Sequence, residues 1–199
     1  MERAILARHG ESELSFAKLT NGNPAAPCPL TEAGRAEARH LGALLADTAI
    51  DLCAVSEFER VQETADLALD GRDVPRVVLP GLNDIRVGGF EGQPIDDYRA
   101  WARSHGPDDR PPGGGESRAD VIRRYVEAYR TILARPEPLI LVVGHALTVR
   151  YLMDAAAGRP PARKVEWVPY AEPFPLTAQQ LDEAVERLAA WTRDPFWQS

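Results

Sequence analysis

Five consecutive apolar residues, Leu139-Ile140-Leu141-Val142-Val143, are followed at once by Gly144-His145. A short run that is apolar at every position is typical of a strand covered by helices on both faces, as in the centre of a parallel sheet. Residues 146–157 then have the spacing of a helix. This stretch therefore predicts a central strand with a histidine at its carboxyl end and a helix directly after it.

The same alternation of strand and helix extends toward both ends of the chain. Apolar runs predict strands at 4–7, 50–55 and 76–79, and helical spacing predicts helices from Thr31, over 56–69, over 121–133 and over 177–191. Strands that alternate with helices favour parallel pairing, because each crossover helix returns the chain to the same end of the sheet. The pattern predicts a three-layer α/β/α sandwich with a mostly parallel central sheet.

The alternation becomes irregular after residue 157. Residues 164–168 have the composition of a strand, but Pro169, Pro173 and Pro175 follow. Proline lacks a backbone N–H donor, so these residues interrupt any strand that would continue from Val168. The sequence leaves open how the edge of the sheet is formed, and with it the contact that a homodimer would use.

Residues 80–115 differ in composition from the segments on either side. They are rich in Gly, Pro and Asp, contain one helical piece at 96–104, and end in Pro111-Pro112-Gly113-Gly114-Gly115. Ser117 and Asp120 then have the spacing of a capping box, which opens the next helix. We interpret residues 80–115 as a cap-like insertion over the active site, within a single domain that spans residues 1–199.

Composition restricts the partners and the compartment. The net charge of −7 disfavours nonspecific binding to nucleic acid or to an anionic membrane. No stretch is long enough to cross a bilayer, and the apolar run at the N-terminus is too short for a signal peptide. Cys28 and Cys53 form neither a CxxC pair nor a metal-spaced set, which favours a reducing compartment. We expect a cytoplasmic protein that binds neither nucleic acid nor a membrane.

Two histidines, His9 and His145, follow predicted strands directly. The carboxyl ends of parallel strands form the crevice in which ligands bind, so these imidazoles should lie near each other. Arg8 precedes His9, and Arg60 lies near the start of a helix that follows a strand. Arginine binds phosphate oxygens in bidentate fashion, and a neutral imidazole can attack phosphorus. The group predicts a phosphoryl-transfer site, although either histidine could instead be a hydrogen-bonded structural residue.

The run Arg8-His9-Gly10-Glu11-Ser12 resembles the signature of the histidine phosphatase superfamily, which is also called the phosphoglycerate mutase-like superfamily. Further segments similar to those of the family follow in the family's order at 29–34, 56–65, 82–92, 115–117 and 143–145. A short motif alone is a weak signal, but several in order are much more specific. On these residues the chain is identified as a member of the phosphatase branch.

The resemblance implies a role for each matching residue. His9 would be the nucleophile that is transiently phosphorylated, and Arg8, Arg60 and His145 would hold the phosphoryl group. Asn21 and Gly22 match a small loop that approaches the substrate, and Ser15 stands where the family often has an asparagine that contacts the phosphoryl group. The resemblance implies that neither a metal nor a cofactor takes part.

Asp84 stands where the family usually has a glutamate that protonates the leaving alcohol. Aspartate is shorter by one C–C bond, about 1.5 Å, and a proton donor must come within hydrogen-bond reach of the leaving oxygen. Asp84 could therefore be the acid, or it could be structural while Glu11 or Glu91 supplies the proton.

Three functions are compatible with these residues. The leading one is a metal-independent phosphatase that hydrolyses a small phosphomonoester through a phosphohistidine. The second is a cofactor-dependent phosphoglycerate mutase, although such mutases are usually longer than this chain. The third is a protein that has lost catalysis and binds a phosphorylated ligand, which the changes at Asp84 and Ser15 would explain.

Overall fold

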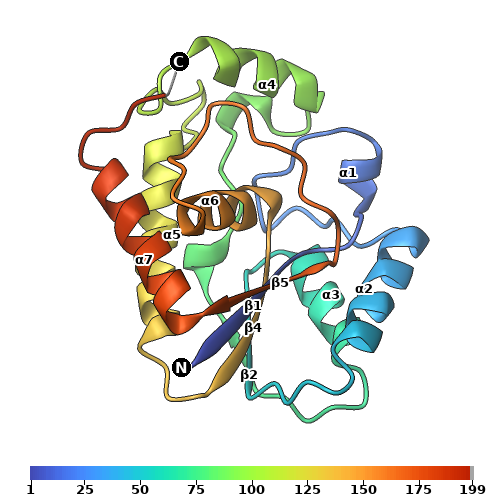
Figure 1. Cartoon of the computed structure of the whole chain (residues 1–199). Helices are drawn as coiled ribbons and strands as arrows, with labels where there is room; N and C mark the ends of the chain where they lie inside the picture. The colour runs from blue at the N-terminus through green and yellow to red at the C-terminus, as the bar shows by residue number, and fades with distance from the viewer. Residues whose placement is uncertain (198–199) are drawn as a thin grey trace.

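The computed structural model describes residues 1–197, and its centre is a five-stranded sheet (Figure 1). The strands are β1 (Arg3–Arg8), β2 (Leu52–Val55), β3 (Arg76–Val78), β4 (Leu139–Gly144) and β5 (Pro173–Thr177). Their order across the sheet is β3-β2-β4-β1-β5, and every pair is parallel except β1 with β5. The predicted central strand at 139–143 is therefore confirmed, with β1 and β2 on its two sides.

Helices cover both faces of the sheet. The helices are α1 (Glu13–Phe16), α2 (Glu32–Leu44), α3 (Glu59–Ala68), α4 (Ile95–Ser104), α5 (Arg118–Leu133), α6 (Ala146–Ala156) and α7 (Ala178–Trp191). Figure 1 shows α2 and α3 on one face and α5, α6 and α7 on the other. The prediction of a three-layer α/β/α sandwich is confirmed.

The strand residues explain why two helical layers form. Along β4, Ile140 and Val142 join the core on the α5–α7 face, whereas Leu141 and Val143 join the core on the α2–α3 face. Successive side chains of a strand point to opposite faces, so a strand that is apolar throughout needs a cover on each side. These residues are at most 1% exposed, so both faces of β4 are covered.

The prediction of a strand at 164–168, near the edge of the sheet, was wrong. Residues 164–168 form no strand, and β5 instead contains Pro173 and Pro175. This strand pairs with β1 on one side only. Residues two apart in a strand direct their backbone nitrogens to the same side, so both proline nitrogens lie on the unpaired outer edge. Prolines are compatible with a strand in this position because no ladder hydrogen bond is lost.

Two segments at the carboxyl end of the sheet contain structure of their own. Residues 10–29, between β1 and α2, include the short helix α1. Residues 79–117 contain two 3-10 turns, at Pro80–Leu82 and Gly88–Phe90, and the helix α4. The ring of Phe90 packs against Tyr98 and Trp101 with centroid distances of 5.8 and 6.0 Å, so aromatic contacts hold α4 to the turn before it.

Replacing Gly34 with alanine is expected to destabilise the fold by about 3 kcal/mol, because an added methyl would overpack a rigid contact. A Cβ on Gly34 would lie 1.9 Å from the backbone oxygen of Glu11, and a Cβ on Gly10 would lie 2.4 Å from the backbone oxygen of Gly34. Helix α2 thus sits directly on the loop that follows His9. Urea unfolding measures the effect, and Gly106→Ala, where a Cβ makes only ordinary contacts, is the matched control.

Candidate active site

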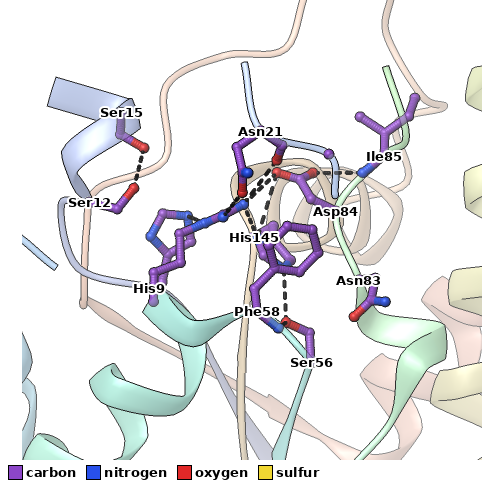
Figure 2. Close-up of polar contacts among 12 residues, drawn as sticks. His9, Ser12, Ser15, Asn21, Ser56, Phe58, Asn83, Asp84, Ile85 and His145 are labelled. Carbon is purple, nitrogen blue, oxygen red and sulfur yellow. Dashed lines mark hydrogen bonds and ion pairs between the residues drawn. The ribbon is translucent and has the colours of Figure 1, made fainter. Parts of the chain in front are cut away.

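The two histidines predicted to converge lie side by side. His9 follows β1 and His145 follows β4, and these strands are paired so that Arg8 is opposite Gly144. The backbone N–H of His9 donates to the oxygen of Gly144 at 2.9 Å. The two imidazole centroids are 5.4 Å apart, and the side chains converge at the carboxyl edge of the sheet (Figure 2).

Hydrogen bonds fix the orientation of the His9 ring. Nδ1 lies 2.7 Å from the backbone oxygen of Gly10, so Nδ1 carries the proton and donates to it. The N–H of Gly10 in turn donates to Thr64 Oγ1 at 3.0 Å, which holds this turn against α3. Nε2 is therefore unprotonated and accepts from Arg60 Nε at 3.2 Å. A phosphoryl group that displaced this contact would meet a free lone pair on Nε2.

Arg60, in the first turn of α3, contacts four of the predicted site residues. Besides His9, its guanidinium donates to Asn21 Oδ1 and lies 3.4 Å from His145 Nδ1. It also forms an ion pair with Asp84 at 3.5 Å. The Arg60 side chain is only 4% exposed, so its orientation is set by these partners and by the ring of Phe58 beneath it. Side chains from four separate connections thus meet at the guanidinium of a residue on α3.

His145 is fully buried at the N-cap of α6. Its Nε2 is 2.9 Å from Ser56 Oγ, and its Nδ1 is 3.6 Å from a carboxylate oxygen of Asp84. Because Arg60 donates toward Nδ1, Nε2 carries the proton and donates to Ser56. Ser56 is a residue whose role the sequence did not predict. It orients the His145 ring so that Nδ1 faces the same space as Nε2 of His9.

Both imidazoles are neutral in this arrangement. Burial lowers the pKa of His9 well below its usual value, and the positive charges of Arg60 and Arg8 lower it further. Burial also lowers the pKa of His145, with Arg60 again adding to the effect. An imidazole must be unprotonated to act as a nucleophile, so the same arginines that could bind a phosphate also keep His9 in its reactive form.

These shifts predict that acid destabilises the protein through its buried histidines. Below about pH 6.5 an unfolded histidine binds a proton that buried His9 excludes, so stability falls as pH falls, by about 1.4 kcal/mol per pH unit for each such residue. In urea unfolding between pH 6.5 and 5.5, where the unfolded histidine is only partly protonated, His9→Gln should lose about 1 kcal/mol less stability than wild type. The exposed residue His40 gives the control, His40→Gln. Equal pH slopes for wild type and His9→Gln would contradict the prediction.

Arg8 is held from the other side of the pocket by aromatic rings that sequence reasoning missed. Its guanidinium carbon lies 3.8 Å from the ring centroid of Tyr170 and 4.7 Å from that of Trp167. Arg8 Nη1 donates to the backbone oxygen of Val168 at 2.7 Å, while its buried Nε has no partner among the described residues. Cation–π contacts of this kind restrain a guanidinium while leaving donors free for an anion.

Asp84 lines the same pocket and is 27% exposed. Its Oδ1 accepts from the N–H of Ile85 (Figure 2), and its Oδ2 lies 3.5 Å from Arg60 Nη2 and 3.6 Å from His145 Nδ1. The turn that carries it is fixed by Arg124, which donates to the backbone oxygens of Asn83 and Asp84. Nothing in the spacing of the sequence could have indicated Arg124, because it lies 40 residues away.

Some of the remaining candidate residues line the pocket and others do not. Asn21 lines the pocket, and so does Ser15, whose hydroxyl is 2.9 Å from that of Ser12. Gly22 does not line the pocket, because its N–H donates to Glu91 and its Cα abuts the backbone at 85–87. Glu91 is occupied with this contact, and Glu11 accepts from Thr31, so neither alternative acid faces the pocket.

The cavity at the carboxyl edge of the sheet has a volume of about 530 Å³. His9, Arg8, Arg60 and Asp84 lie along it, and its farther part is formed by α4 and the segment 163–168. Within residues 1–197 no three His, Cys, Asp or Glu side chains gather in a way that could hold a metal ion. The concentration of arginine and imidazole at one end suits a tetrahedral oxyanion such as a phosphoryl group.

An α/β sandwich with two imidazoles and two arginines at the carboxyl edge of its sheet defines the class of histidine-centred phosphoryl-transfer proteins. The sequence profile of the histidine phosphatase superfamily (branch 1) matches residues 4–193. The chain belongs to this superfamily, and the resemblance drawn from the sequence is confirmed.

Two similar relatives have names that state different activities. An adenosylcobalamin/alpha-ribazole phosphatase of Salmonella typhimurium is 41% identical over 107 residues, which cover 50% of this chain and 52% of that protein. A 2,3-bisphosphoglycerate-dependent phosphoglycerate mutase of a Methylobacterium species is 38% identical over 178 residues, with 79% of this chain and 82% of the mutase covered. The match thus spans only about half the length of the Salmonella phosphatase, but most of the mutase.

Among solved structures, the alpha-ribazole phosphatase of Shigella flexneri is similar, with a TM-score of 0.69 and 33% identity. The alignment covers 79% of this chain and 81% of the Shigella protein. Because both named activities occur among relatives of similar length, the length of the chain does not separate a phosphatase from a mutase.

Proposed function

We propose that this protein is a metal-independent phosphatase that hydrolyses a small phosphomonoester through a phosphohistidine at His9. The observation that carries the proposal is the position of Arg60, which contacts His9, His145 and Asp84 at once. A guanidinium placed between the nucleophile, a second imidazole and an acid would stabilise the charge of the phosphoryl group throughout its transfer.

In the first step, Nε2 of neutral His9 attacks phosphorus and the bond between phosphorus and the leaving oxygen breaks. Asp84, in its protonated form, gives its proton to that oxygen, and the alcohol departs. Arg8 and Arg60 donate hydrogen bonds to the remaining phosphoryl oxygens. When the phosphoryl group replaces Arg60 at Nδ1 of His145, the imidazole proton moves to Nδ1 and donates to a phosphoryl oxygen, while the hydroxyl of Ser56 donates to Nε2. Asn21 and Ser15 line the same pocket. The positive pocket stabilises the charge on these oxygens.

In the second step, water attacks the phosphohistidine and the bond between phosphorus and Nε2 breaks. Asp84, now a carboxylate, accepts the proton that water loses, which restores the acid for the next cycle. Asp84 is preferred as this group over Glu11 and Glu91 because it faces the pocket and they do not. Gly22 is assigned no direct contact with substrate.

The role of Asp84 predicts a dependence on the leaving group. Asp84→Asn should lower kcat for an alkyl phosphate by about 10²- to 10⁴-fold, the usual contribution of a general acid, because an alkoxide needs a proton to depart. The same variant should lose much less activity with 4-nitrophenyl phosphate, whose leaving group departs as an anion. Asp84→Glu, which keeps the acid, should restore part of the alkyl phosphatase activity. Equal losses on both substrates would contradict an acid role.

A mutase is the second candidate, and the similarity to the Methylobacterium mutase is the observation that favours it. The chemistry at His9 would be the same, but the phosphoryl group would pass to a phosphoglycerate in place of water. Activity that depends on added 2,3-bisphosphoglycerate would support this reading. Release of inorganic phosphate without that addition would support the phosphatase.

The decisive experiment is a screen for phosphate release over sugar phosphates, phosphoamino acids, nucleotides and alpha-ribazole phosphate, with His9→Ala as the blank. Turnover that disappears in the blank supports the proposal. Binding of phosphate esters without turnover across the whole panel would instead indicate a protein that has lost catalysis.

Within residues 1–197 no helix is both long and apolar enough to span a bilayer. We further propose that the protein acts in the cytoplasm, which is supported by Cys28 and Cys53 being unpaired, buried thiols. A homodimer remains a prediction that sedimentation can check.

A further inference from the structure

The cavity continues beyond the phosphoryl-binding residues into a second part, which we call the distal chamber. Its walls come from α4, the first residue of α5 and the segment 163–168, and they include Ile95, Ala102, Arg103, Arg118, Val165 and Trp167. A phosphoryl group would occupy only the inner end of a 530 Å³ cavity. The distal chamber therefore faces whatever group carries the phosphate.

Arg118 stands in the wall of this chamber without a carboxylate partner among the described residues. Its Nη1 donates to the hydroxyl of Tyr151 at 3.3 Å, and its guanidinium lies 5.8 Å from the ring centroid of Tyr98. The side chain is half-buried. A guanidinium has five N–H donors, so several remain for a ligand.

Other arginines nearby are neutralised by carboxylates. Arg86 and Arg110 pair with Glu116 and Asp120, and neither lines the cavity. Arg99 does line it, but it pairs with Asp96 at 3.2 Å. Arg118 therefore differs from these three arginines, because each of them is paired with a carboxylate.

Two further cations lie at the rim of the chamber. Arg163 donates to the backbone oxygen of Arg103 at 3.0 Å, which ties the segment 163–168 to the end of α4, and both side chains border the cavity. The acidic side chains that line the cavity are already paired, since Asp84 contacts Arg60, Asp96 contacts Arg99 and Glu166 contacts Lys164. The chamber therefore has an excess of positive charge although the whole chain carries −7.

The rest of the chamber wall is apolar. Ile95, Ala102, Leu147 and Val165 contribute aliphatic surface, and Trp167 leaves 62% of its surface exposed at the mouth. An apolar wall with a few convergent cations suits a ligand that combines an apolar body with an anionic end. A simple neutral alcohol would leave the donors of Arg118 without a partner in the bound state.

We propose that the distal chamber selects phosphomonoesters whose leaving alcohol has an apolar body and a second oxyanion, a carboxylate or a phosphate, bound by Arg118. This inference rests on the proposed function, because it assigns the substrate class of the same site. Arg118 acts here as a specificity-determining residue, with Arg103 and Arg163 adding positive charge at the rim.

Matched aryl phosphates test the proposal. Three esters share one ring and differ at a meta or para group: carboxymethyl, phosphonomethyl, or the neutral carbamoylmethyl. In wild type, kcat/KM for at least one anionic ester should exceed that for the amide by about 10- to 100-fold, the worth of one charge-assisted contact. Comparison of the two anionic esters tells whether a carboxylate is preferred or a phosphonate, which stands in for a phosphate.

Variants identify the residue that produces the preference. Arg118→Gln should bring the ratio of anionic to neutral ester close to one, and Arg118→Lys should keep part of it. Arg110→Gln removes an arginine that pairs with Asp120 outside the cavity, so wild-type activity and ratio are expected. A ratio near one in wild type, or a wild-type ratio in Arg118→Gln, would overturn the proposal.

Calorimetry on His9→Ala tests the distal anion site separately from the proposed phosphatase activity. This protein binds the esters without turning them over, so the anionic preference can be read even if wild type shows no phosphatase activity. A tighter complex with the anionic ester, together with no turnover in wild type, would reject the proposed function and keep the distal site. Equal affinities would reject the distal site alone.

Discussion

Replacing His9 with alanine is expected to lower phosphatase turnover by roughly 10⁴- to 10⁶-fold, the range seen when a covalent nucleophile is removed from an enzyme. The physical reason is that Nε2 of His9 is the one unprotonated nitrogen that is both fixed by a donor contact from Nδ1 to Gly10 and directed toward Arg60. Initial rates of phosphate release from a good substrate measure the effect.

The phosphohistidine formed at His9 can be detected directly by labelling. Brief reaction of wild type with a phosphate-labelled ester, followed by denaturation, should leave label that is stable to alkali and lost in acid, as expected for phosphohistidine. His9→Ala should retain no such label, whereas His40→Ala, on the exposed surface of α2, should retain it fully. Circular dichroism establishes that each variant is folded. Turnover of His9→Ala within tenfold of wild type would exclude His9 as the nucleophile.

Replacing Arg60 with alanine should lower kcat by about 10³-fold, comparable with the removal of a transition-state arginine or oxyanion donor. This side chain is the common partner of His9, His145 and Asp84, so its removal weakens phosphoryl stabilisation and loosens the nucleophile together. Arg60→Lys should recover little, because an ammonium cannot reproduce the planar fork of donors.

Arg60→Ala should also change the acid response of the site. The charge of Arg60 is one cause of the lowered pKa of His9 and of His145, so without it both imidazoles should protonate at higher pH. The activity that remains should therefore decline sooner than in wild type as pH falls. Arg39→Ala, an exposed arginine on α2, is the control for both measurements. A variant with wild-type kcat would contradict the central position given to Arg60.

The sequence predicted most of the helices and the parallel strands because their signals are local. Ser117 and Asp120 form the capping box that their spacing predicted, and Thr177 and Gln180 form another. The strand at 173–177 escaped prediction because proline is normally incompatible with a ladder. Only its position at the edge of the sheet, next to β1, makes the missing donors harmless.

The sequence likewise predicted one part of the candidate site and missed another. That His9 and His145 would meet followed from the sequence, since both end parallel strands and such ends share one edge of the sheet. The partners that orient them were not predictable from local patterns. Ser56 reaches His145 across 89 residues, and Arg124 fixes the turn of Asp84 from 40 residues away.

The sequence by itself determined the layered fold and the chemistry at its centre, because strand periodicity and the run from Arg8 to Ser12 are properties of neighbouring residues. The tertiary structure alone decided what surrounds that chemistry. It placed Tyr170 and Trp167 against Arg8, and it left Arg118 without an acidic partner in the cavity wall. Such contacts join residues far apart in the chain, and their geometry exists only once the packing of both cores has fixed where each loop lies.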